Sequence, residues 1–174
     1  QLDKPNFAEY KVDFAKLTPI DKWLVVRTNE YINKATAAMD DYKSAALIKE
    51  FELFVDDISN WYIRTNRRRF WKTEDQQDKM VAYWTLFNAL KVCVQTIAPI
   101  TPFMTEHIWQ NLIKKCDSSV AESVHLSDWP TVLEGVEDDG VIEQTALVRE
   151  VIATAMRLRN EQQIKVRQPL SKIF

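Results

Sequence analysis

Glycine is scarce in this chain, and its scarcity limits the folds that the chain can form. Only Gly135 and Gly140 occur among 174 residues. Sheets with tight hairpins usually need more glycine, because several hairpin turns require backbone conformations that other residues rarely adopt. Phosphate-binding loops of the P-loop and Rossmann types are excluded as well, since both are built on glycine motifs. The composition therefore favours a helical fold without a nucleotide-binding loop of either type.

Apolar residues recur at three- and four-residue steps in five segments, which indicates five amphipathic helices. Thr18 and Thr101 are each followed by proline, a pairing typical of a helix N-cap with proline at the first helical position. Thr73, with Gln76 placed for a capping box, predicts another helix start. We therefore expect helices over residues 18–39, 44–70, 73–98, 101–115 and 140–163.

The same periodicity predicts which side chains face the core. A chain of 174 residues is long enough to build one sizeable core from such stripes. The expected inward positions on the second, fourth and fifth helices are Leu47, Phe51, Phe54, Val55, Ile58 and Tyr62; Phe103, Ile108, Trp109 and Leu112; and Ile142, Ala146, Val151, Ile152 and Met156.

The pattern divides the chain into three parts. Residues 1–17 are aperiodic and are interpreted as a connector, and residues 18–163 as a helical bundle. Residues 164–174 alternate like a strand and stop mid-pattern, so they are interpreted as the truncated start of a further region. Long antiparallel helices joined by short loops form up-down bundles. The expected fold class is all-α, an up-down bundle of about five helices with a strand-like C-terminal segment.

Residues 59–71, with the sequence SNWYIRTNRRRFW, combine four arginines with four aromatic side chains. Arginines interleaved with aromatic rings can hold phosphates and stack on unpaired bases. The same pattern also fits a core helix with a solvated basic end, and short motifs of this kind have low specificity. Both interpretations stay open at this point.

A helical wheel sharpens the prediction for this segment. At about 100° per residue, Tyr62 lies on the apolar stripe, Arg64, Arg68 and Trp71 fall together on one flank, and Arg67 and Phe70 fall on the other. Arg69 falls almost on the stripe itself. We therefore expect Arg69 to leave the core, to reach a buried carboxylate, or to lie where the helix has outrun its neighbours. Tyr62 is expected to pack, as is the preceding tryptophan.

Catalytic and metal-binding patterns are missing from the sequence. The two histidines, His107 and His125, have no second ligand at metal spacing, and no nucleophile or acid/base motif occurs. Cys93 and Cys116 do not form a ligand pair, and we expect reduced thiols. No stretch is long and apolar enough for a membrane span, and no signal peptide is evident. We expect a cytoplasmic, non-catalytic chain with no metal site.

A formal net charge of −2 means that any nucleic-acid site must be a local basic patch. One candidate is the basic end of the second helix and another is the basic stretch near the C-terminus. Two polar residues of the first helix could join them if they face outward. The candidate binding residues are Arg64, Arg67, Arg68, Trp71 and Lys72; Lys165 and Arg167, with Arg157 and Arg159 nearby; and Arg27 and Asn29.

Residues 59–71 resemble the signature helix in the anticodon-binding bundle of class I isoleucyl-tRNA synthetases. Residues 17–32 resemble the first bundle helix of that family, and residues 97–112 resemble its entry into a later helix. Residues 123–130 are similar to the segment that leads to the last helix, and residues 164–170 to the exit from the bundle. The resemblance keeps the order of five motifs and covers nearly the whole chain.

The resemblance implies a module that binds the anticodon stem-loop and helps to select isoleucine tRNA for ATP-dependent aminoacylation. The HIGH and KMSKS motifs and the editing domain of the family do not occur here. The chain therefore resembles an excised domain, and we expect no cofactor in it; ATP and magnesium belong to the full-length enzyme. The expected partners are tRNA and a catalytic domain of the same polypeptide, and the expected state is a monomer.

Two alternatives remain. The valyl-tRNA synthetases share the bundle, but they tend to carry an acidic residue soon after the Trp-Tyr pair, where this chain has Arg64. The other alternative is a helical protein–protein interaction module without RNA binding. Exposure of Arg64, Arg67, Arg68 and Trp71 on one surface favours RNA binding, whereas salt bridges that bury all four favour a scaffold.

Overall fold

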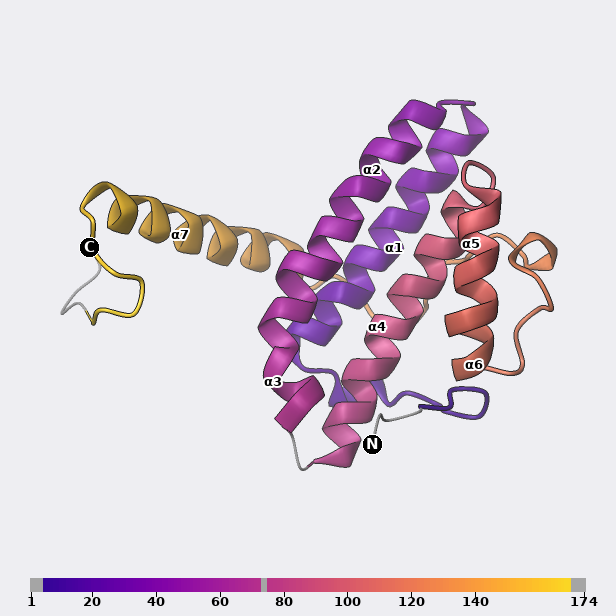
Figure 1. Ribbon diagram of the computed structural model, residues 1–174, viewed down its shortest axis with the longest axis horizontal. Coiled ribbons are helices and arrows are strands. Elements are labelled where there is room, and N and C mark those ends of the chain that lie inside the picture. Colours follow the sequence, from indigo (N-terminus) through magenta and orange to yellow (C-terminus); the bar gives the residue numbers. More distant parts are fainter. Residues whose placement is uncertain (1–4, 73–74, 170–174) are drawn as a thin grey trace. The chain divides into compact units, whose positions relative to one another are not determined.

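The computed structural model describes residues 5–72 and 75–169, and these residues form helices and turns without a strand (Figure 1). Their contacts divide the chain into a first unit, Gln1–Glu137, and a second unit, Asp138–Phe174. The prediction of an all-α fold is confirmed. Among the helices of the described ranges, none combines the length and the apolar character needed to cross a membrane.

Four helical segments of the first unit lie side by side and alternate in direction, as in an up-down bundle (Figure 1). With the helix of the second unit, these segments match the five predicted helices to within three residues at each end. The first-unit elements are η1 (Phe14–Lys16), α1 (Pro19–Asp40), α2 (Ser44–Asp56), η2 (Asp57–Ile63), α3 (Arg64–Lys72), α4 (Gln76–Ile97), α5 (Pro102–Ile108), η3 (Trp109–Ile113), α6 (Lys114–Cys116) and η4 (Val124–Leu126).

Capping side chains fix two of the helix starts. The Asp21 backbone N–H donates to Thr18 Oγ1 at 3.4 Å, and the Thr18 backbone N–H donates to Asp21 Oδ2 at 3.1 Å, which completes a capping box on α1. At α4, the Asp75 carboxylate accepts hydrogen bonds from two backbone N–H groups of the first turn. Asp75 is thus the cap, in place of the predicted Thr73, which lies outside the described residues. An aspartate suits this position because the positive end of the helix dipole also stabilises its negative charge.

The second long helix is interrupted by a π-helical segment. It runs through α2, then the π-helical η2, then α3. A π turn holds more residues than an α turn, so it changes the register of the side chains that follow. Phe54, Ile58 and Tyr62 are buried, in agreement with the predicted stripe, whereas Val55 is 39% exposed. The buried stripe is therefore narrower than the sequence predicted.

The fourth helix shows a similar change of register. Trp109 and Ile113 have no exposed surface, but Phe103 is 91% exposed and Leu112 is 38% exposed. The prediction that Phe103 and Leu112 face the core is wrong. At Leu112 the cause is η3, because its π-helical turn brings the next residue, Ile113, to the inner face. Phe103 lies in the first turn of α5, where nothing in the described ranges covers it.

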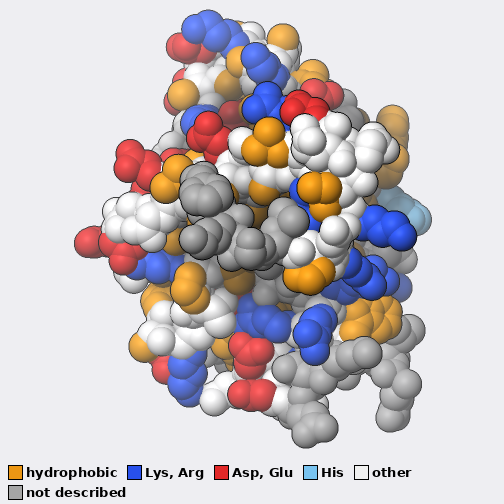
Figure 2. Space-filling view, turned by 90° about the vertical axis from the view of Figure 1, so that its left-hand side faces the viewer, with side chains coloured by type: hydrophobic (Ala, Val, Ile, Leu, Met, Phe, Trp, Pro, Cys, Tyr) orange, Lys and Arg blue, Asp and Glu red, His pale blue; other side chains and the backbone are white. Residues whose placement is uncertain are grey.

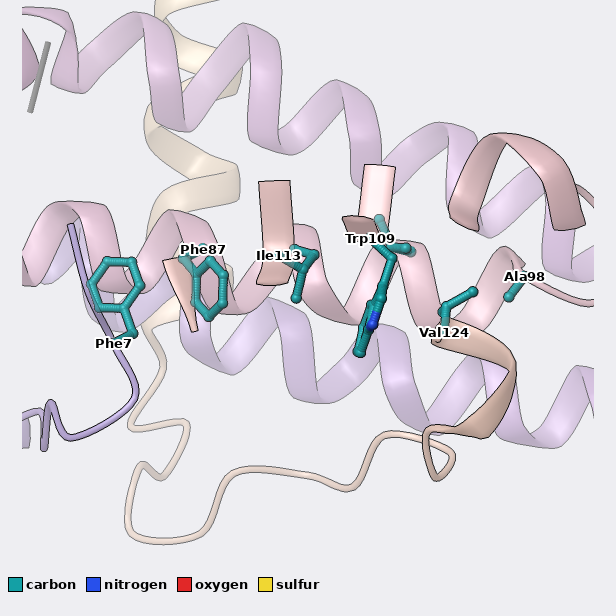
Figure 3. Close-up of a cluster of buried hydrophobic side chains, with 7 residues drawn as sticks. Phe7, Phe87, Ala98, Trp109, Ile113 and Val124 are labelled. Carbon is teal, nitrogen blue, oxygen red and sulfur yellow. The ribbon is translucent and has the colours of Figure 1, made fainter. Parts of the chain in front are cut away.

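A cluster of buried apolar side chains joins the N-terminal segment to α4, η3 and η4 (Figure 3). The Phe7 and Phe87 ring centroids lie 4.7 Å apart, and the Phe7 backbone N–H donates to the Cys116 carbonyl at 2.6 Å. The indole N–H of the buried Trp109 donates to the Ala121 carbonyl at 2.9 Å. A buried tryptophan stabilises the core through the large apolar area that it buries, and the hydrogen bond of its N–H fixes the orientation of its ring. The segment before α1 is thus held to the bundle by its own core contacts.

The second unit consists mainly of α7 (Val141–Glu161), which begins after Gly140. Gly140 has a φ of +89°, in the left-handed region that glycine adopts readily. Within this unit, the described residues include no second helix that could cover the predicted apolar stripe. Ile142 is half-buried, and the exposed positions of the stripe are Ala146, Val151, Ile152 and Met156.

Residues 164–169 form a turn at 166–167 within an irregular segment, and not the predicted strand. A strand needs a partner for its backbone groups, and here two carbonyls are already used: Arg159 Nη1 donates to Lys165 O at 2.9 Å and to Gln168 O at 2.8 Å. The rest of the predicted strand, residues 170–174, lies outside the described residues.

Candidate nucleic-acid interface

Four candidate RNA-binding side chains share one face of α3. Arg64, Arg67, Arg68 and Trp71 stand at positions i, i+3, i+4 and i+7, which places all four, Arg67 included, on one side of a regular helix. All four are exposed, Trp71 to 75%. Within residues 5–72 and 75–169, none of the three arginines has an ion-pair partner. We call these four side chains the basic face.

The fourth arginine of the motif turns the other way. Arg69 Nη1 and Nη2 lie 2.9 and 3.0 Å from the two carboxylate oxygens of Asp21. Its Nε and Nη2 lie 3.0 and 2.6 Å from those of Asp78. Burial by itself lowers the pKa of Arg69, but hydrogen bonds to Asp78 and Asp21 outweigh burial and raise it. Of the three outcomes that the sequence left open for Arg69, the structure shows the one in which it reaches a buried carboxylate, because Asp21 is fully buried.

Two further polar side chains extend this contact into the core. The Tyr62 hydroxyl donates to Asp21 Oδ1 at 2.6 Å, and burial, then the Asp21 charge, raises the pKa of Tyr62. The Asn66 amide donates to the Tyr62 carbonyl at 3.0 Å and accepts from Arg69 Nη1 at 2.9 Å. Tyr62 is fully buried and Trp61 is half-buried, as expected for side chains that pack. The inner side of the motif is therefore scaffold, and its outer side is the basic face.

Arg27 does not face outward and so does not join the basic face. Its Nε lies 2.9 Å from Asp57 Oδ2, and its Nη2 lies 2.8 Å from Glu50 Oε1. Burial by itself lowers the pKa of Arg27, but hydrogen bonds to Glu50 and Asp57 outweigh it and raise the pKa. Its guanidinium also lies over the Phe54 ring, 5.4 Å from the centroid. Arg27 is thus a structural residue that joins α1 to α2 and η2.

Asn29 is also occupied within the fold. Its amide donates to the Leu133 carbonyl at 2.9 Å and accepts from the Leu133 N–H at 2.8 Å. This pair of bonds ties the segment after η4 to α1. The condition on which Asn29 was included among the candidates, an outward-facing side chain, is not met.

The C-terminal candidates belong to the second unit. Lys165 and Arg167 are exposed. Arg157 forms an exposed ion pair, with its Nε 4.0 Å from Glu161 Oε1. Arg159 holds backbone carbonyls and is half-buried. The side chain of Lys72, the remaining candidate, lies outside the described residues.

The exposed groups suit phosphate binding and base stacking, and they do not suit acid/base catalysis. Guanidinium groups bind phosphate oxygens in a bidentate manner and stay charged at any physiological pH. In the ranges that the structure describes, no group of three His, Cys, Asp or Glu side chains could hold a metal ion. Acidic and basic side chains are intermingled on the face drawn in Figure 2, so this face does not form one continuous positive surface.

Sequence reasoning did not identify the partners of the inward arginines. The contact between Asp21 and Arg69 spans 48 residues, which is too far for local spacing to predict. A usable signal did exist: Glu50 and Asp57 stand seven residues apart, two helical turns, on the helix that follows Arg27.

The fold and the basic face together describe a helical domain that can bind nucleic acid, and comparison with known proteins identifies its family. The family model described as the anticodon-binding domain of tRNA ligase matches residues 21–174. The chain therefore belongs to the family of tRNA ligase anticodon-binding domains.

The similar proteins are isoleucine–tRNA ligases, and they match most or all of this chain. The chain is 42% identical to an isoleucine–tRNA ligase of Clostridium novyi over 174 residues, all of this chain and 17% of that protein. It is 39% identical to the isoleucine–tRNA ligase of Thermus thermophilus over 97% of this chain and 16% of that protein. Another, from Treponema pallidum, is 41% identical over 87% of this chain and 14% of that protein. The chain thus spans less than a fifth of these relatives.

Proposed function

We propose that this chain binds the anticodon stem-loop of isoleucine tRNA and helps to select that tRNA for aminoacylation. The family supports anticodon binding, and the names of the relatives support isoleucine. The observation that carries the proposal is the basic face, three arginines and one tryptophan exposed together on α3. The aminoacylation itself requires a catalytic domain of the same polypeptide, where ATP and magnesium act. We place the protein in the cytoplasm, among the proteins of translation.

The basic face has the chemistry that an RNA loop requires. Phosphate contacts position an RNA, and contacts to unpaired bases select it. Arg64, Arg67 and Arg68 supply three permanent charges for the phosphates. Trp71 supplies a stacking surface for one base at the end of the same helix. Both kinds of contact are therefore available within two turns of α3.

A comparison of two tRNAs tests the proposal. We expect the chain to bind isoleucine tRNA more tightly than valine tRNA, and the triple variant Arg64→Ala/Arg67→Ala/Arg68→Ala to bind both weakly. Lys49→Ala is the matched control, because Lys49 is an exposed cation on α2 with no ion pair in the described residues. Equal affinity for both tRNAs, or a triple variant that binds like Lys49→Ala, would refute the proposed function.

A further inference from the structure

Three helix ends meet at one partly buried ion cluster, in which Asp21 is buried and Arg69 and Asp78 are half-buried. Asp21 lies in the first turn of α1, Asp78 lies in the first turn of α4, and Arg69 lies in the last turns of α3. Arg69 donates to both oxygens of both carboxylates. The positive N-terminal ends of α1 and α4 stabilise the negative charges of Asp21 and Asp78, respectively.

The cluster binds the guanidinium in a fixed orientation. Two planar, two-point contacts define the position of Arg69 more narrowly than a single ion pair does. Thr18 Oγ1 lies 3.4 Å from Arg69 Nη1 and 2.6 Å from Asp21 Oδ2, and Asn66 adds a further bond from within α3. The helix that carries the basic face is thus attached to the starts of two neighbouring helices through one side chain.

We infer that Arg69, Asp21 and Asp78 position the basic face for RNA without touching RNA themselves. This inference rests on the proposed function, since it names the residues that prepare the same surface. Arg69 is adjacent in sequence to Arg68 and two residues from Trp71. The anchoring of Arg69 therefore fixes the rotation of α3 about its axis, and with it the direction in which Arg68 and Trp71 point. Groups held in place before binding lose less entropy when the RNA arrives.

The inference makes a prediction whose sign is opposite to that of simple electrostatics. Asp78→Asn removes a negative charge near a surface that meets a polyanion, so charge alone would strengthen tRNA binding. Loss of the two-point contact instead releases α3. We expect Asp78→Asn to weaken binding of isoleucine tRNA about two- to thirtyfold, the range of effects for residues that act through a coupled network.

Asp75→Asn is the matched control. It removes the same charge three residues away, and asparagine caps a helix as well as aspartate, so α4 keeps its start. Asp75 makes no contact with Arg69 in the described ranges. We expect Asp75→Asn to bind isoleucine tRNA as tightly as the wild type or slightly more tightly.

Arg69→Lys separates position from charge. Lysine keeps the positive charge but cannot form the two planar contacts. We expect Arg69→Lys to weaken binding as Asp78→Asn does, and the double variant to be no weaker than either, because both changes break one cluster. A lysine variant that binds like the wild type would show that only the charge matters and would overturn the inference.

Amide hydrogen exchange provides a readout that needs no RNA. We expect residues 64–71 to exchange faster in Asp78→Asn than in Asp75→Asn, at a temperature where circular dichroism shows both variants fully folded. If the wild type bound no tRNA, the proposed function would fail while this comparison would still test the cluster. If the wild type binds and the two asparagine variants agree in affinity and exchange, the positioning role is refuted and the proposed function stands.

Discussion

Arg27 Nε lies 2.9 Å from Asp57 Oδ2, which joins α1 to the start of η2 through an ion pair between two buried side chains. Glu50 closes the site from the preceding helical turns, with Oε1 2.8 Å from Arg27 Nη2. A buried pair of this kind adds little over a well-packed apolar pair, but its rupture leaves an uncompensated charge in the core. Arg27 is therefore sensitive to the loss of either carboxylate.

Asp57→Ala should lower the free energy of unfolding by about 3–5 kcal/mol, because it leaves the Arg27 charge partly unpaired. Urea titration followed by circular dichroism measures the change. Lys34→Ala is the control, since Lys34 Nζ lies 3.5 Å from the same Glu50 oxygen but its side chain is 55% exposed. Its loss should change stability by less than about 1 kcal/mol. Similar losses for the two variants would contradict this account.

Trp71→Ala should leave the melting temperature nearly unchanged, because 75% of the side chain is exposed. If Trp71 stacks on a base, the variant should bind isoleucine tRNA more weakly by about 1–3 kcal/mol and discriminate less against valine tRNA. Trp109→Ala is the comparison, since Trp109 is fully buried and its loss should cost about 3–5 kcal/mol of stability. A melting temperature for Trp71→Ala as low as that of Trp109→Ala would assign Trp71 to the core.

Alkaline pH should destabilise the chain through Cys93. Burial raises the pKa of the Cys93 thiol to about 12, from an ordinary value of 9.0. The folded state keeps this proton where the unfolded chain has lost it, so the stabilisation is complete below pH 9 and is lost as the pH rises toward 12. The free energy of unfolding should therefore fall more steeply with pH in the wild type than in Cys93→Ala. Urea titrations at several pH values test this, and parallel curves would contradict it.

The helix starts and the role of Arg69 were accessible from the sequence, because both depend on local rules. Thr18 followed by proline marks a helix start through its own side chain. Arg69 falls on an apolar stripe, and a buried guanidinium needs an acidic partner wherever that partner lies in the chain. The pattern therefore limited Arg69 to three outcomes, and contact with a buried carboxylate is the one that the structure shows.

The register of the π-helical segments and the partners of the buried side chains could not be predicted from the sequence, because both depend on contacts between distant segments. Nothing in the spacing of residues 57–63 or 109–113 distinguishes a π-helical turn from an α-helical one, and this change placed Ile113 inward in place of Leu112. The stripe on α7 satisfies the same periodicity as the bundle helices, yet no second helix among the described residues of its own unit covers it. Periodicity identifies a face that can pack, and only the fold determines whether another element covers it.

The salt dependence of binding tests the central claim most directly. If Arg64, Arg67 and Arg68 each meet one phosphate, the slope of log K against log salt for isoleucine tRNA should be about −2 to −3, at roughly −0.7 to −0.9 per phosphate. Each single arginine-to-alanine variant should then flatten the slope by about one unit and weaken binding of all tRNAs alike. Lys49→Ala should keep the wild-type slope. Arginine variants with the wild-type affinity and slope would show that the basic face of α3 is not the RNA-binding surface.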